Sequence, residues 1–175
     1  STLHTNDAPG AITRLIDMEI EPFLIASSIE MVIAQRLVRR LCNVCASPAG
    51  MEEGQFRANL ALLGVPREGV ANSDKVLRSV GCQQCQNLGY RGRVGIFEIM
   101  TMSDAIHSLV IKNAAAPDIR RVAVEEGMRS LQLSGWEQIK RGLTTFEEVI
   151  RYSDGFGTDN GNGHHEEISS ETQTV

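Results

Sequence analysis

The chain has 175 residues, of which 42% are hydrophobic and 22% charged, so it can form one globular domain or two small lobes that share a core. Its net charge of −5 argues against a nucleic-acid-binding protein, because neutralising phosphates requires a surplus of Lys and Arg on one face. No apolar stretch reaches the roughly 18 to 20 residues that span a bilayer, which favours a soluble, cytoplasmic protein.

The first residues have the composition of the end of a buried strand. They include no methionine and no basic or apolar leader, so we interpret the chain as a part of a larger protein. Asn6 or Asp7 followed by Pro9 predicts the start of a helix. Apolar residues at i, i+3 and i+4 spacing from Ile12 give this helix one hydrophobic face.

A second helix is predicted to begin at Pro22, and its dense apolar residues indicate that it is buried. These apolar residues are Leu24, Ile25, Ile29, Val32 and Ile33. Residues 36–41 then alternate with a period of two, which predicts a strand that leads into the first cysteine pair. Residues 46–80 are rich in glycine and proline and indicate an insertion that contains one short helix around residues 56–63.

Glycines at positions 89, 92 and 95 predict a turn, followed by a strand over about residues 94–99. Four short helices are expected next, and they begin near Ser103, Pro117, Leu131 and Thr145. Each is too short to be stable alone, so we expect the four to pack on one another and on the strand as one compact lobe, with Trp136 in its core.

The last of these helices carries the pattern of a capping box. The Thr145 hydroxyl is expected to accept from the N3 amide while the Glu148 side chain reaches back, and the helix should run to about Tyr152. Residues 155–175 are mostly small, polar or structure-breaking, which predicts a disordered tail.

All four cysteines occur in two Cys-x-x-Cys pairs, Cys42 with Cys45 and Cys82 with Cys85, and 36 residues separate the pairs (82 − 45 − 1). Two tight turns of this kind can present four thiolates to one metal ion, so the spacing favours a structural Zn²⁺ site. The alternatives are a thioredoxin-like redox pair or two disulfides. Neither pair opens a helix after a buried strand, and no secretory leader indicates an oxidising compartment.

Several motifs occur together in an order and spacing that resemble one protein family. They are Ser1–Ala8, Ala34–Cys42, Gly81–Cys85, Gly89–Glu98, Glu126–Met128 and Gly142–Thr145. These motifs resemble the C-terminal part of the type II secretion and type IV pilus assembly ATPases, the general secretion pathway protein E family. The resemblance extends from Ser1 to about Ser153.

The resemblance implies a hexameric, RecA-like motor in the cytoplasm that hydrolyses ATP with Mg²⁺. Such a motor acts on an inner-membrane platform protein, drives assembly of a pilus or pseudopilus, and contacts the membrane only through its partners. In this family the segment around His4 resembles a histidine box that faces the γ-phosphate of ATP, which makes His4 a candidate sensor of the phosphate. Without the resemblance, a locally packed histidine is the simpler interpretation.

The chain departs from the family pattern because it has no Gly-x-x-x-x-Gly-Lys-Ser/Thr loop and no acidic Walker B strand. Nothing in it can therefore enclose phosphates or hold Mg²⁺, and we expect the isolated chain to be inactive. Arg91 and Arg93 can reach a neighbouring subunit, or they can be ordinary surface arginines. Two other classes of function stay open, a stand-alone zinc-ribbon interaction module and a redox protein.

The expected fold class is α/β, the C-terminal part of a RecA-like P-loop ATPase core with a tetracysteine insertion and a small helical lobe. The predicted boundaries place the core in residues 1–41, the metal-binding insertion in 42–88, the strand with the helical lobe in 89–153 and the tail in 154–175.

Overall fold

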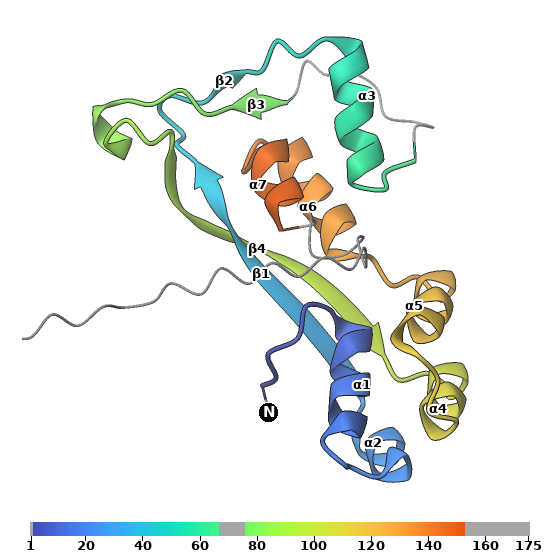
Figure 1. The fold of residues 1–175 in the computed structure, drawn as a ribbon. Helices are drawn as coiled ribbons and strands as arrows, with labels where there is room; N and C mark the ends of the chain where they lie inside the picture. Colours follow the sequence, from blue (N-terminus) through green and yellow to red (C-terminus); the bar gives the residue numbers. More distant parts are fainter. Residues whose placement is uncertain (1, 67–75, 153–175) are drawn as a thin grey trace, which may run out of the picture.

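Two long antiparallel strands run through the centre of the molecule (Figure 1). The computed structural model describes residues 2–66 and 76–152. Strand β1 (Met31–Leu41) pairs with β4 (Tyr90–Thr101), from Met31 opposite Thr101 to Arg39 opposite Arg93. A shift of register then places Leu41 opposite Tyr90. Both strands were predicted, and both are longer than the sequence pattern indicated.

The architecture is mixed α/β, as expected, whereas the RecA-like core stays a prediction. Helix α1 (Ala8–Asp17) begins where the sequence predicts, because Asp7 Oδ1 accepts a hydrogen bond from the Gly10 N–H at 2.7 Å. The expected strand end before this helix is not seen, since residues 2–5 form neither helix nor strand.

The second predicted helix is shorter and more exposed than expected. Helix α2 (Pro22–Ser28) begins at Pro22 but ends before Ile29, whose backbone is extended. Val32 and Ile33 belong to β1, where β-branched side chains fit well. The prediction that the helix is buried was wrong for Leu24, which is 52% exposed.

One hydrophobic core lies at the end of the β1–β4 ribbon where the helices α1, α2, α4 (Asp104–Ile111) and α5 (Ala116–Glu125) meet. We call it the first core. Its buried members are Ala8, Ile12, Ile25, Ala26, Ala34, Met100, Ile106, Val110, Ile119, Ala123 and Met128.

A second core lies at the opposite end of the ribbon and joins α3 (Glu53–Leu62) to α6 (Leu131–Lys140) and α7 (Phe146–Arg151). Its buried members are Phe56, Leu60, Leu63, Val65, Val76, Trp136, Ile139, Phe146 and Val149. Three aromatic rings form its centre. The Trp136 and Phe146 rings stack with centroids 5.6 Å apart, and the Phe56 ring packs 6.1 Å from Trp136 and 6.0 Å from Phe146.

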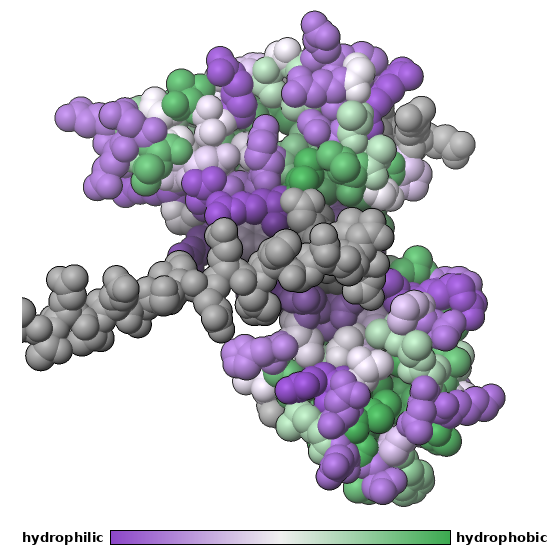
Figure 2. All heavy atoms as spheres, in the orientation of Figure 1, coloured by the Kyte–Doolittle hydropathy of each residue, from purple (hydrophilic) through white to green (hydrophobic). Residues whose placement is uncertain are grey.

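The four C-terminal helices therefore do not form one lobe, which corrects the expectation from the sequence. Helices α4 and α5 contribute to the first core, whereas α6 and α7 contribute to the second. Figure 2 shows the two ends as separate masses of side chains. The helix of the predicted insertion, α3, shares a core with α6 and α7, so the insertion is not a separate module. The domain boundaries proposed from the sequence stay predictions.

Close packing between α6 and α7 requires a glycine at position 135. A β-carbon there would overlap Val149 Cγ1 and would lie 2.9 Å from Val149 Cγ2. We expect Gly135→Ala to lower the free energy of unfolding by about 1–3 kcal/mol, although alanine is the better helix former. Urea denaturation measures the loss. Adding Val149→Ala should restore part of the stability, and a Gly135→Ala variant as stable as the wild type would contradict this packing.

Among the described residues, no helix has both the length and the apolar character needed to cross a bilayer. The predicted tail, residues 154–175, lies outside the part of the chain that the structure describes.

Candidate metal centre and the histidine segment

The two cysteine pairs lie at the ends of the two central strands. Cys42 directly follows β1, and a turn brings Cys45 next to it, with Ala46 N–H donating to Cys42 O at 3.0 Å. Cys82 precedes the short 3₁₀ helix η2 (Gln83–Cys85), which ends at Cys85 shortly before β4. The short strand β2 (Ser47–Pro48) follows the first cysteine pair, and β3 (Leu77–Arg78) precedes the second. Because β2 and β3 pair with each other, the two cysteine turns face each other.

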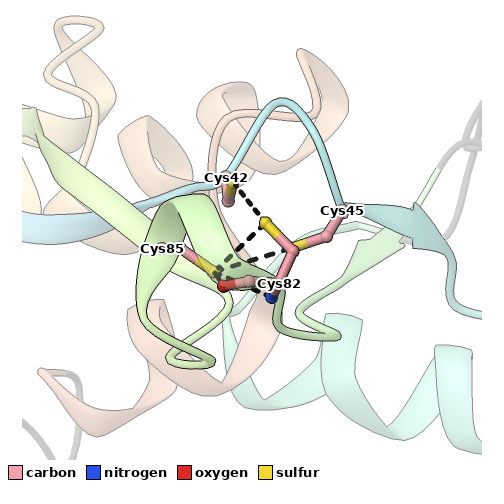
Figure 3. A group of neighbouring side chains, drawn as sticks. All are labelled: Cys42, Cys45, Cys82 and Cys85. Atoms are coloured by element: carbon pink, nitrogen blue, oxygen red, sulfur yellow. Dashed lines mark hydrogen bonds between the residues drawn. The ribbon is translucent and has the colours of Figure 1, made fainter.

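The four Sγ atoms converge, as Figure 3 shows, and all lie within 4.8 Å of one another. The separations are 3.9 Å between Cys42 and Cys82, 3.8 Å between Cys45 and Cys85, and 3.7 Å between Cys82 and Cys85. Four sulfurs at about 2.3 Å from a tetrahedral Zn²⁺ are separated by about 3.8 Å. None of the four cysteines forms a disulfide bond. The sulfur geometry therefore fits a four-thiolate metal site.

Backbone N–H groups point at these sulfurs. Cys85 Sγ accepts from the Cys82 and Gly89 amides, both at 3.2 Å. Burial raises the pKa of Cys85, but these two N–H donors, together with hydrogen bonds to the Cys82 and Cys45 side chains, outweigh it and lower the pKa to about 6. The amide of Val44 lowers the pKa of Cys42. Burial raises the pKa of Cys45 to about 11, although the Gly81 N–H donates to its sulfur at 3.3 Å.

Two of these donors are glycines whose backbone conformation excludes other residues. Gly81 has φ +113°, and a β-carbon there would lie 2.8 Å from the Asn87 carbonyl oxygen. Gly89 has φ +75°, and a β-carbon would lie 2.6 Å from Ser79 Cβ. Only glycine can direct its amide at the sulfur in these two conformations without strain.

A hydrogen-bonded cluster lies beside the cysteines, at the outer edge of β1. Arg39 donates from its backbone N–H to Glu148 Oε2 at 3.0 Å and from its guanidinium to Glu148 Oε1 at 2.6 Å. Its guanidinium also lies 4.2 Å from the centre of the Tyr90 ring. The Tyr90 hydroxyl in turn is 3.1 Å from Thr145 Oγ1.

This cluster corrects the predicted capping box. Thr145 caps α7 as expected, since its Oγ1 accepts from the Glu148 N–H at 3.4 Å. Glu148 does not reach back to the start of the helix. Its carboxylate binds Arg39 instead, because a charged partner that offers both a guanidinium and an amide gives stronger hydrogen bonds than one neutral N–H.

Glu148 makes the stability of the folded protein depend on pH. Burial raises the pKa of Glu148, but the hydrogen bonds from Arg39 outweigh it and hold the pKa below the ordinary 4.5. A carboxyl group with a lowered folded-state pKa stabilises the protein fully above its unfolded pKa and loses this contribution as the pH falls through the folded value.

We therefore expect the stability difference between the wild type and Glu148→Gln to be constant above about pH 5.5 and to shrink below the ordinary carboxyl pKa. Urea denaturation of both proteins from pH 7 to pH 3 measures this difference. A difference that does not change with pH would contradict the ion pair.

His4 lies away from helices and strands, in the exposed segment before α1. Arg36 on β1 binds the two residues that follow His4. Its guanidinium donates to Thr5 O at 3.3 Å and to Asn6 Oδ1 at 3.1 Å. Arg91 and Arg93 are exposed on β4 rather than in the predicted turn.

Sequence reasoning missed one charged cluster. Glu98 on β4 is fully buried and accepts from the Ala8 N–H at 2.9 Å. Arg120 on α5 donates to Glu98 Oε2 at 3.1 Å and to the carboxylate of Asp7. Burial lowers the pKa of Arg120, but the two carboxylates outweigh it and raise the pKa above its ordinary value. The sequence could have indicated the burial of Glu98, because side chains alternate along a strand and Glu98 falls on the same face of β4 as Ile96 and Met100.

Comparison with known proteins gives the family. The model of the type II/IV secretion system protein family matches residues 1–151. The type IV pilus assembly ATPase PilB of Myxococcus xanthus is 45% identical over 150 residues, which are 86% of this chain and 26% of that protein. Type II secretion system protein E of Pseudomonas aeruginosa is 45% identical over 151 residues, 86% of this chain and 28% of that protein.

A more distant relative is PilB of Thermus thermophilus, 36% identical over 150 residues, which are 86% of this chain and 16% of that protein. The chain thus spans little more than a quarter, or less, of the length of these relatives. Because the family model covers nearly all the described residues, the chain belongs to the family of type II and type IV secretion system proteins.

Proposed function

We propose that the chain is the C-terminal part of a hexameric cytoplasmic motor that hydrolyses ATP with Mg²⁺ and drives assembly of a pilus or pseudopilus. The observation that carries the proposal is the identity of up to 45% to pilus assembly and secretion ATPases over 86% of the chain. In this proposal the nucleotide loop and the magnesium ligands belong to a part of the protein outside this sequence, and residues 1–41 are the C-terminal part of the RecA-like core.

Within this motor His4 is the proposed sensor of the γ-phosphate. Its exposure is compatible with this role, because a phosphate bound by another part of the protein can approach the imidazole. The motor transmits its conformational change to an inner-membrane platform protein, and this partner holds it at the membrane. The surface arginines Arg91 and Arg93 are proposed contacts for a neighbouring subunit.

We further propose that Cys42, Cys45, Cys82 and Cys85 bind one Zn²⁺ as thiolates. Three of the six sulfur separations, at 3.7 to 3.9 Å, support it, and all four sulfurs lie within 4.8 Å of one another. Four protein ligands leave no open position on the ion, so its role is structural. The ion would fasten the ends of the 36-residue insertion, whose helix α3 packs in the second core. A stand-alone zinc ribbon is disfavoured, because α3 shares that core with α6 and α7.

A genetic experiment tests the motor role. Deleting the gene in the organism that encodes it should abolish surface pili or the secretion of exported proteins. The wild-type gene should restore the function, His4→Ala should not, and His107→Ala, which changes a histidine on α4, should restore it. A deletion strain with normal pili and normal secretion would contradict the proposal.

A further inference from the structure

The residues after His4 are held by side chains from three different elements. Arg36 of β1 binds Thr5 and Asn6, Glu98 of β4 binds the Ala8 amide, and Arg120 of α5 binds Asp7. The partners lie far apart in the sequence, since Ala8 and Glu98 are 90 positions apart and Asp7 and Arg120 are 113 positions apart. The segment next to the histidine is thus fixed by tertiary contacts.

Arg120 is the centre of this arrangement. One guanidinium nitrogen donates to Glu98 Oε2 at 3.1 Å, and the other donates to Asp7 and lies 3.5 Å from Glu98 Oε1. The same Oε1 accepts from the Ala8 N–H. Asp7 uses its second oxygen to cap α1 through Gly10. Both carboxylates therefore have partners on both oxygens, which fixes their orientation.

The contacts go beyond the capping of α1. Asp7 accepts from the Gly10 amide and Glu98 accepts from the Ala8 amide, and Arg120 then binds both carboxylates. Glu98 is a carboxylate with no solvent exposure in a face of apolar residues. A buried carboxylate is unfavourable unless it is paired and hydrogen-bonded, so Glu98 and Arg120 depend on each other. Movement of the start of α1 away from β4 would remove the Ala8 N–H from the buried Glu98 Oε1 and the Asp7 carboxylate from Arg120.

We propose that Arg120 and Glu98 are positioning residues for His4. Neither touches the nucleotide. They hold the start of α1, and with it the residues that follow His4, at a fixed place on β4 and α5. The inference rests on the proposed function, in which His4 senses the γ-phosphate. It also gives α5 a role, since a shift of this helix in the first core would move the histidine segment with it.

A double-mutant cycle in the longer protein tests the proposal by steady-state ATP hydrolysis. The variants are Arg120→Gln, His4→Ala and the two together. The matched control is Arg121→Gln, which changes the neighbouring arginine on the same helix, an exposed partner of Glu125. We expect Arg120→Gln to lower kcat roughly tenfold with little change in KM. In the His4→Ala background it should cause no further loss. Arg121→Gln should behave like the wild type.

Three results would overturn the proposal, and they separate its failure from that of the proposed function. If His4→Ala lowers kcat and Arg120→Gln does not, the positioning role is wrong and the motor stands. If the two losses multiply in the double variant, Arg120 acts by another route. If His4→Ala leaves kcat unchanged, the proposed sensor is wrong, and the positioning role is wrong with it.

A second variant guards against simple misfolding. Asp7→Asn keeps an oxygen that can cap α1 and removes the charge that Arg120 binds. Hydrogen exchange in the 175-residue chain then reports on the segment without nucleotide. The Ala8 amide should exchange roughly tenfold faster in Asp7→Asn and in Arg120→Gln, while amides of the second core keep their protection. An Ala8 amide that exchanges at the wild-type rate in both variants would also overturn the proposal.

Discussion

Replacing Cys85 by serine is expected to abolish metal binding and to lower stability strongly. Purified wild-type protein should contain about one equivalent of zinc, and Cys85→Ser should contain almost none. In a loop-closure estimate, a link across the 36-residue insertion contributes on the order of 4 kcal/mol. We expect a loss of that order in the free energy of unfolding, measured by urea denaturation with elemental analysis of the same samples.

The control for this substitution is Val44→Ser, which introduces the same side chain between Cys42 and Cys45 at an exposed position. It should keep both the metal and the stability. Folded, reduced wild-type protein that contains no zinc would rule out the metal site. If Cys85→Ser retained a full equivalent of metal, the set of four ligands would be wrong.

Trp136→Ala should have the second largest effect. The indole is 6% exposed, stacks on Phe146 and contacts Phe56 of α3. Truncating a buried aromatic side chain costs about 3–5 kcal/mol. Because α3 packs against this ring, the loss should also loosen the insertion. In the longer protein, we expect secretion or piliation to fail. Urea denaturation monitored by circular dichroism measures the stability.

Two other substitutions serve as controls for the stability loss in Trp136→Ala. Phe56→Ala, in the helix on the other side of the contact, should cost a similar amount if the three rings form one core. Phe23→Ala should change stability by less than about 0.5 kcal/mol, since that aromatic side chain is 67% exposed on α2. If Trp136→Ala were as stable as Phe23→Ala, the second core would be wrongly described.

Local signals in the sequence predicted most helix starts correctly. Pro22 begins α2, Ser103 caps α4 through the Ile106 amide, and Thr145 caps α7. These starts depend on residues within one turn of the chain, so the sequence pattern contains their cause. The convergence of the four cysteines was also predictable from spacing, because each Cys-x-x-Cys turn is local and only the pairing of the two turns is long-range.

Contacts between distant residues could not be predicted in the same way. Glu148 has the right spacing to reach back to Thr145, yet Arg39, which is 109 residues away in the sequence, takes its carboxylate. The division of the C-terminal helices between two cores depends likewise on α3 and α1, which lie far from them in the sequence. The hydrophobic pattern of a helix shows that it packs, but not against which partner.

ATP hydrolysis tests the central claim most directly. The longer protein that we propose contains this sequence, purified with its nucleotide loop, should hydrolyse ATP, and His4→Ala should lower its kcat. The isolated 175-residue chain should show no turnover, because it has no loop of the Gly-x-x-x-x-Gly-Lys-Ser/Thr type. Turnover by the isolated chain that His4→Ala abolishes, or a longer protein that binds no ATP, would contradict the account.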